Sequence, residues 1–358
     1  MDSPAHPAST GLRRPGVAAA LAAAALFGAS TPAAKMLLGS VLPWTLAGIL
    51  YLGSGLGLSL YRLFSKRDGA TWPERGEHRW LVGAIASGGV AAPVLLMLGL
   101  THMPASSASL LLNAEGVLTA LLAWFVFKEN FDRRIALGML AIVAGAVVLS
   151  WPREMDTASA LPALAIVAAC LCWAIDNNLT RKISLMDAVS LASIKGLVAG
   201  SVNLSLAFVL GAQLPAMLPG LGAMVVGFFA YGVSLVLFIT GLRNLGTARA
   251  GAYFSAAPFF GAVVSIVLLG EPISGPLLLA GLFMGIGVWL HLTEQHSHQH
   301  THSADAHEHE HVHDGDVHHD HEHQPPVAAG TRHRHRHQHA ALRHEHDHVP
   351  DVHHHHTH

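Results

Sequence analysis

The chain alternates between long apolar runs and short polar connections from residue 16 to residue 292. Most runs hold about 17 to 25 residues with few charges, the length that an α-helix needs to cross a bilayer. The runs lie at about 16–38, 44–61, 80–101, 104–127, 134–151, 160–180, 188–211, 219–241, 245–269 and 276–292. The pattern therefore predicts an all-α integral membrane protein with ten transmembrane helices.

A stretch of the first half returns in the second half. Residues 99–151 hold two apolar runs joined by a charged turn, and residues 241–290 repeat this arrangement. Gly99, Ala108, Glu129 and Gly145 align with Gly241, Ala250, Glu271 and Gly287. A repeated group of membrane spans is typical of secondary transporters built from two related halves. We expect five-helix halves at 17–151 and 160–292, preceded by a cytoplasmic segment, residues 1–16.

The lysines and arginines between the runs are distributed unevenly. With a cytoplasmic N-terminus, fourteen of them fall on the cytoplasmic side and one, Arg153, falls outside. The fourteen are Arg13, Arg14, Arg62, Lys66, Arg67, Arg75, Arg79, Lys128, Arg133, Arg134, Arg181, Lys182, Arg243 and Arg249. Because positively charged connections stay in the cytoplasm, we expect both termini there. Five spans per half then require that the second half be inverted relative to the first.

Composition agrees with a membrane protein. Hydrophobic residues make up 51% of the chain and charged residues 12%, whereas soluble domains carry about 25% charged residues. The net charge of −2 and the lack of a basic cluster give no indication of nucleic-acid binding. No nucleophile elbow, phosphate-binding loop or pair of carboxylates indicates an enzyme, so a transporter is the predicted class.

Several motifs resemble those of one transporter family. Each half opens with an aromatic residue followed by Gly or Ala, Phe27-Gly28 and Trp173-Ala174. The fourth run begins PASSASLL at Pro104 and is followed by Glu129, and the last run of each half carries spaced glycines. These features resemble the EamA family of the drug/metabolite transporter superfamily over residues 17–292.

The resemblance implies a ten-helix exporter of small molecules in a bacterial inner membrane, working by alternating access. Family members often carry a Glu-Pro pair in the middle of spans four and nine. This chain has Glu115-Gly116 in span four and Ala257-Pro258 in span nine, so each half keeps one member of the pair. We place Asn113, Glu115 and Pro258 in the transport pathway.

Glu115 lies near the middle of the fourth run, where an ionised carboxylate costs about 2.5–3.5 kcal/mol on insertion scales. Such a residue faces a polar cavity, pairs with another group or stays protonated. One interpretation is that Glu115 carries a proton or cation during transport. The other is that it is a neutral, hydrogen-bonded acid or a glutamate at a wet cavity with no carrier role.

A second polar group lies toward the cytoplasmic ends of spans six and seven. Asp176 and Asn177 come shortly before Arg181, and Lys195 lies about two turns into span seven. The two charges are therefore expected at comparable depth. One interpretation is a buried pair lining the pathway, and the other is that Lys195 reaches the interface while Asp176 ends its helix.

The segment 296–358 differs from the rest of the chain. It holds 24 of the 28 histidines, mostly at alternate positions with Asp and Glu between them. Because few apolar residues are available to form a core, we expect this segment to be disordered alone. Neutral imidazole suits Ni²⁺, Co²⁺ and Zn²⁺, so we expect the segment to bind these ions, although transport requires no cofactor.

The candidate metal ligands are nineteen of the histidines of this segment. They are His296, His298, His300, His302, His307, His309, His311, His313, His318, His319, His321, His323, His333, His335, His337, His339, His344, His346 and His348. If they feed the pathway, the substrate is a divalent transition-metal cation, which is the leading candidate. If they only sense or buffer metal, the substrate is a small metabolite or drug. A homodimer is one alternative for the oligomeric state.

Overall fold

The computed structural model describes residues 15–64, 76–127, 133–151, 160–183, 187–245, 247–292, 296–302, 305–312, 332–339 and 342–348. The chain divides into two units, Met1–Glu294 and Gln295–His358. Each is described by itself. Most of the predicted N-terminal segment 1–16 lies outside the described residues.

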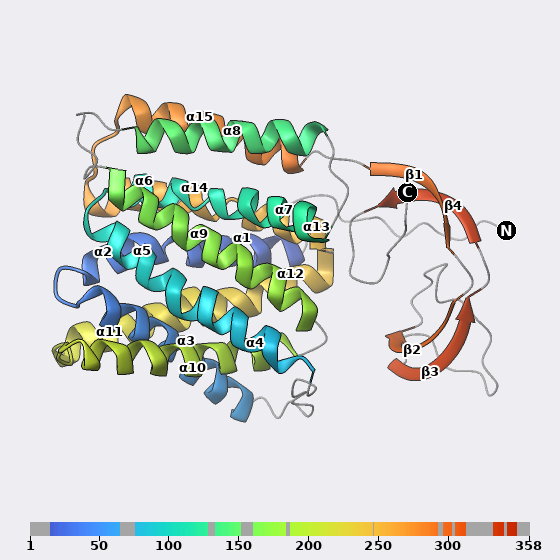
Figure 1. Cartoon of the computed structure of the whole chain (residues 1–358), viewed down its shortest axis with the longest axis horizontal. Coiled ribbons are helices and arrows are strands. Elements are labelled where there is room, and N and C mark those ends of the chain that lie inside the picture. Colours follow the sequence, from blue (N-terminus) through green and yellow to red (C-terminus); the bar gives the residue numbers. More distant parts are fainter. Residues whose placement is uncertain are drawn as a thin grey trace. The chain divides into compact units, whose positions relative to one another are not determined.

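The first unit is a bundle of helices (Figure 1). In its first half these are α1 Pro15–Gly28, α2 Ser30–Leu37, α3 Pro43–Phe64, α4 His78–Ala84, η1 Ile85–Ala91, α5 Ala92–Thr101, α6 Ala105–Leu111, α7 Ala114–Phe127 and α8 Arg133–Ser150. In its second half they are α9 Leu161–Thr180, η3 Arg181–Ile183, α10 Ala188–Val209, α11 Met217–Gly227, η4 Phe228–Val233, α12 Ser234–Leu245, α13 Thr247–Phe254, α14 Ala257–Leu269 and α15 Gly275–Leu292.

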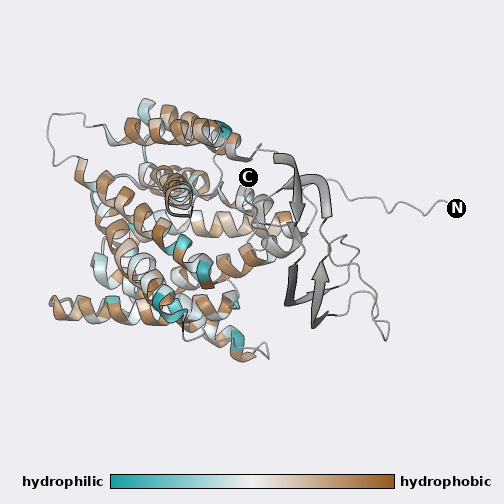
Figure 2. Cartoon of the chain, turned by 45° about the vertical axis from the view of Figure 1, so that its right-hand side comes forward, coloured by the Kyte–Doolittle hydropathy of each residue, from teal (hydrophilic) through white to brown (hydrophobic). Residues whose placement is uncertain are grey.

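Seven helical stretches in the described part are long and apolar enough to cross a membrane. They are Gly16–Leu37, Pro43–Phe64, His78–Thr101, Ala105–Leu122, Leu161–Thr180, Val189–Val209 and Met217–Gly241. Three shorter apolar helices, Ala136–Ser150, Ala257–Leu269 and Gly275–Leu290, occupy the predicted spans five, nine and ten. Figure 2 shows hydrophobic residues along the helices throughout the bundle. The predicted all-helical membrane domain is therefore confirmed in outline.

Several predicted spans are not continuous α-helices. The fourth is interrupted at Leu112-Asn113 and the ninth at Ser255-Ala256. At both places backbone N–H groups bond to the carbonyl three residues earlier, Asn113 to Leu110 and Ala256 to Tyr253. These tighter bonds end one helix before the next begins. The predicted spans at 104–127 and 245–269 therefore each consist of two helices, α6 with α7 and α13 with α14.

The third and eighth spans each contain a π-helix, η1 and η4. η1 ends just before Pro93, which has no N–H to bond to the carbonyl four residues earlier. The backbone there changes its hydrogen-bonding register from four to five residues. π-helical turns inside α-helices often occur at functional sites.

The two halves pack through a symmetrical set of helix pairs. α3 packs on α10 and α8 on α15, so these equivalent helices meet each other, and α6 of the first half packs on α14 of the second. α1 of the first half is equivalent to α9 of the second, and α5 of the first is equivalent to α12 of the second. α1 packs on α12, and α9 packs on α5. The halves thus exchange helices reciprocally, as expected of two copies related by an approximate two-fold axis.

Small residues allow the closest of these contacts. A side chain at Gly196 of α10 would meet the backbone nitrogen of Gly55 on α3 at 2.7 Å. No real Cβ atom fits at that distance, so the α3–α10 pair needs glycine here. This is the close helix approach that small-xxx-small spacing permits in membranes.

The second unit contains four short strands, β1 His296–His302, β2 Asp305–Val312, β3 Arg332–His339 and β4 Leu342–His348. β1 pairs with β4 and β2 with β3, both antiparallel. We predicted a disordered segment, and the structure differs over these four ranges. The reason lies in the sequence: histidine at every second position has the two-residue period of a β-strand.

Candidate functional site

The best-defined polar contact in the bundle joins α9 to α10. Lys195 Nζ lies 2.6 Å from Asp176 Oδ1 and 2.7 Å from Oδ2. The Thr180 hydroxyl donates to the same carboxylate at 2.9 Å. The exposed fraction is 18% for the lysine side chain and 9% for the aspartate. Of our two interpretations, the structure has the buried ion pair rather than separate interfacial charges.

The π-helix η1 provides the space that this pair needs. A Cβ atom at Gly88 would lie much closer to Asp176 Oδ2 than van der Waals contact allows. The carbonyl of Gly88 accepts two hydrogen bonds, from the Tyr51 hydroxyl at 2.9 Å and from Trp173 Nε1 at 3.0 Å. Gly88 therefore lets the carboxylate approach the backbone while two aromatic residues hold that backbone in place.

Glu115 lies next to this group, in the first turn of α7. Asn177 Nδ2 donates to Glu115 Oε1 at 2.8 Å and to Thr119 Oγ1 at 3.4 Å. Asn177 is exposed and Glu115 is half-buried. Because Asn177 follows Asp176 in the chain, the α9 segment carries both contacts. We call Glu115, Asp176, Asn177 and Lys195 the polar cluster.

The interruption between α6 and α7 places Glu115. Asn113 is buried at the interruption and its Nδ2 donates to the carbonyl of Leu110 at 2.9 Å. Cys170 Sγ on α9 contacts the carbonyl of Leu111 at 3.7 Å. Side chains thus satisfy carbonyls that an uninterrupted helix would bond internally. Asn113 supports the interruption, two residues before Glu115.

Pro258 lies at the corresponding interruption of the second half, at the start of α14. A proline in this position ends no helix, because the first N–H groups of a helix have no partner inside it. Pro258 is half-buried. The hydrogen bonds and the ion pair bring Glu115, Asp176, Asn177 and Lys195 together.

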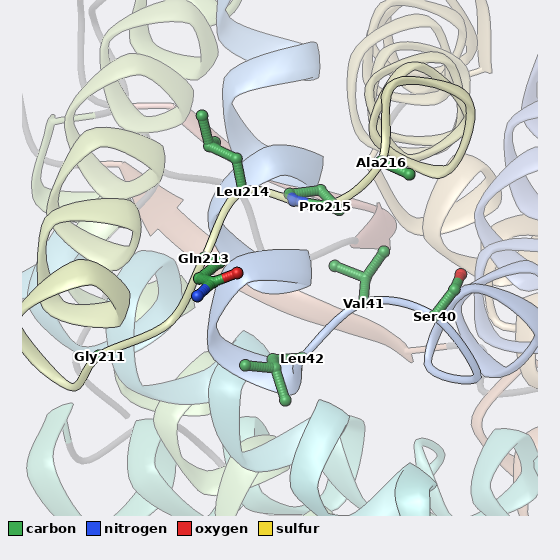
Figure 3. A pocket seen from close by; sticks show the side chains of 8 residues that line it. All are labelled: Ser40, Val41, Leu42, Gly211, Gln213, Leu214, Pro215 and Ala216. Carbon is green, nitrogen blue, oxygen red and sulfur yellow. The ribbon is translucent and has the colours of Figure 1, made fainter.

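A cavity of about 410 Å³ lies away from the polar cluster (Figure 3). It is bounded by the connection between α2 and α3 and by the connection between α10 and α11. Its lining is Ser40, Val41, Leu42, Gly211, Gln213, Leu214, Pro215 and Ala216. No charged residue lines it, so it offers no electrostatic recognition of a substrate.

The bundle offers no obvious metal centre. Among the residues whose side chains are described, no three of His, Cys, Asp and Glu lie close enough to hold an ion. Of the predicted metal ligands, His313, His318, His319, His321 and His323 lie outside the described residues. The others lie on the four strands of the second unit.

Sequence reasoning missed the aromatic and glycine components of the site. Tyr51 and Tyr231 lie on different halves with ring centroids 5.6 Å apart. Tyr51 and Trp173 both meet Gly88, but the sequence gives no sign that a carbonyl in span three is their common partner. The one available signal was Trp173 itself, which opens the second half just before Asp176.

Comparisons with known proteins agree with the bundle. The model of the EamA-like transporter family matches residues 14–151 and again residues 160–293. An uncharacterized transporter of Methanothermobacter thermautotrophicus is 29% identical over 289 residues, covering 75% of this chain and 84% of that protein. A crystal structure of another protein, 19% identical, covers 77% of this chain and 98% of its own with a TM-score of 0.60.

The structural likeness shows the fold alone, whereas the family match covers most of the chain and repeats once in each half. Both matched segments contain part of the polar cluster, Glu115 in the first and the other three residues in the second. The resemblance seen in the sequence is thereby confirmed. The chain belongs to the EamA-like transporter family, whose members are membrane transporters and not enzymes.

Proposed function

We propose that the protein exports a small polar solute across a bacterial inner membrane by alternating access between ten spans in two inverted halves. The observation that carries the proposal is the polar cluster, which lies beside an interrupted helix inside an apolar bundle. Ionisable residues in such positions are costly and are typical of transport pathways. Interrupted helices are typical of transporter binding sites.

The cluster favours a small polar solute over a bare metal ion. Lys195 lies 2.6 Å from Asp176 and neutralises its charge. A divalent cation at this carboxylate would meet the repulsion of the ammonium group. A solute with both donors and acceptors can instead bond to Glu115, Asn177 and the ion pair. For this reason we favour a small metabolite over a metal cation as the solute that binds the polar cluster.

The inverted arrangement is supported by the charge distribution and by the reciprocal helix pairs. Reporter enzymes fused after Lys66, Arg133 or His302 should read cytoplasmic, because positive connections remain inside. Fusions near His102 or Asp156 should read external. A reporter that reads external after His302 contradicts both the topology and the direction of export.

A transition-metal cation is the second candidate substrate, and the strand register of the second unit supports metal binding there. Histidine lies opposite histidine three times in each strand pair, for example His298 opposite His346 and His309 opposite His335. Directly opposite residues have Cα atoms about 4.5–5.5 Å apart. Two imidazoles at that spacing can ligate one Ni²⁺, Co²⁺ or Zn²⁺ ion.

We expect the purified full chain to bind several Ni²⁺ or Zn²⁺ ions and a chain ending at Glu294 to bind almost none. Binding should weaken near pH 5, because imidazole protonates below a pKa of about 6.5 and protonated imidazole is no ligand. Calorimetry with each metal measures this. A variant with Asn at the twelve paired histidines is the matched control, since it keeps the length and polarity of the segment.

The same two chains separate the candidate functions in cells. Under the metabolite proposal, both the full chain and the chain ending at Glu294 reduce the cellular content of the same small polar metabolite. Loss of Ni²⁺, Co²⁺ or Zn²⁺ tolerance on truncation, with unchanged metabolite content, would instead favour metal export. Metabolite content and metal tolerance should also be measured in cells that lack the protein and in cells that overproduce it.

A further inference from the structure

A lysine from another helix binds the α5–α6 connection, by which we mean residues 100–106, including the last two residues of α5 and the first two of α6. Lys35 on α2 donates from Nζ to the carbonyl of Leu100 at 2.5 Å, of Thr101 at 3.2 Å and of Met103 at 3.0 Å. The last carbonyls of a helix have no partner within it and attract a cation. Lys35 therefore satisfies the end of α5.

A glutamate from the other half binds the second part of the same connection. Glu271 Oε1 accepts from the N–H of Ala105 at 2.6 Å and Oε2 from the N–H of Ser106 at 2.8 Å. Glu271 follows Gly270, the left-handed residue with φ 65° that ends α14. A carboxylate bonded to two backbone N–H groups is among the stronger neutral-to-charged contacts in proteins. Glu271 thus links the second half of the bundle to the first at this point.

These contacts lie at the end of the bundle opposite to the Asp176–Lys195 pair. Gly99, at the end of α5, packs against Pro162 and Ile166 at the start of α9. Asp176 lies near the other end of the same helix. In Figure 1 the connections from α2, α5 and α14 gather at the left end of the bundle.

The helix ends on either side of the connection are packed inside the bundle, whereas Thr101, His102 and Pro104 are exposed. Leu100 and Ala105 are fully buried and Ser106 is 2% exposed. Asn177 of the polar cluster, by contrast, is exposed. The two ends of the bundle therefore differ: the residues that flank the α5–α6 connection are buried, whereas the polar cluster at the other end includes an exposed side chain.

We propose that Lys35 and Glu271 form a latch that closes the α5–α6 end of the pathway and releases when that end opens. This rests on the alternating access proposed above. The latch joins three segments, α2, the α5–α6 connection and the α14–α15 connection, through contacts made to backbone atoms. Such contacts form or break as a unit without repacking a core. They bias the equilibrium between two conformations by as much as they differ between them.

Glu129 aligns with Glu271 in the sequence, but it lies outside the described residues. The proposal is therefore confined to the α5–α6 end.

Thiol labelling in liposomes tests the latch without any substrate. The full chain with Cys170→Ala and Cys172→Ala carries a reporter at one end, Ser109→Cys on α6. Ser109 is fully buried and its hydroxyl has no hydrogen-bond partner among the described residues, so cysteine costs no contact. The reporter for the opposite end is Ser193→Cys on α10, which is 3% exposed.

We expect Lys35→Met and Glu271→Gln each to raise the labelling rate of Ser109→Cys about tenfold, the effect of losing about 1.4 kcal/mol from the closed state. Labelling of Ser193→Cys should fall or stay unchanged. Lys35→Arg keeps the charge and the donors, so it should label like the parent. Ser40→Ala removes an exposed hydroxyl bond to Leu37 at the same end and serves as the matched control.

Unchanged labelling of Ser109→Cys in both latch variants would overturn the proposal. So would an equal rise at both reporters, since that result indicates general loosening of the bundle. If the latch behaves as expected while no metabolite or metal export is found, only the proposed substrate fails. If export is found but the labelling rate of Ser109→Cys is the same in the parent and in the latch variants, only the latch proposal is contradicted.

Discussion

Lys195→Met is expected to abolish transport and to lower the free energy of unfolding by about 3–5 kcal/mol, the usual cost of leaving one member of a buried ion pair without its partner. Asp176 is 9% exposed in the pair, and after the change it retains only the Thr180 hydroxyl among its described partners. Thermal unfolding in detergent measures the stability, and uptake into inside-out vesicles measures the transport.

The double variant Asp176→Asn, Lys195→Met separates folding from function. Because both charges are removed together, most of the lost stability should return. Transport should not return, because the solute loses both charged partners. If the double variant transports at the parental rate, the ion pair serves only to hold α9 on α10.

Glu115→Gln should abolish export driven by a pH gradient while leaving solute exchange intact. A carboxyl can take up a proton on one side and release it on the other, whereas an amide cannot titrate. The substitution should preserve the fold, since the amide oxygen of Gln still accepts from Asn177 as Glu115 Oε1 does at 2.8 Å. Counterflow in proteoliposomes with and without a pH gradient measures both activities.

Two further variants make the role of Glu115 specific. Glu115→Asp keeps a titratable group and should retain part of the gradient-driven export. Thr119→Val removes the other side-chain partner of Asn177, at 3.4 Å, and should leave proton coupling in place. If Glu115→Gln keeps the parental rate and pH dependence, Glu115 is a packing group, and Asp176 becomes the coupling candidate.

The sequence was sufficient for the helical halves and for the approximate depth of the charged residues. Apolar runs report the spans directly, because each must bury its backbone in hydrocarbon. Asp176 and Lys195 were expected at comparable depth because each lies about two turns from a connection. The structure adds to this expectation only that α9 and α10 lie close enough for the two charges to form an ion pair.

The interruptions and the long-range partners were beyond the sequence. Leu112-Asn113 lies in an apolar run. The composition of that run is compatible both with a helix that continues through this pair and with one that ends there. The contact of Asn177 with Glu115 joins residues 62 positions apart and depends on how α7 packs against α9. Lys35 did carry a signal, because it is a cation within an apolar run and follows Phe27 by eight residues, as Arg181 follows Trp173. Its three carbonyl partners, however, are a property of the fold.

The reciprocal exchange of helices between the halves has a consequence for biogenesis. α1 finds its partner α12, and α9 its partner α5, only across the boundary between the halves. A ribosome that has released residues 1–151 has inserted helices whose neighbours are not yet made. Insertion precedes helix association in membranes, so the nascent first half waits in the bilayer with unmatched glycine-rich surfaces. Until translation of the second half supplies those neighbours, the first half is accessible to proteases and to other nascent chains.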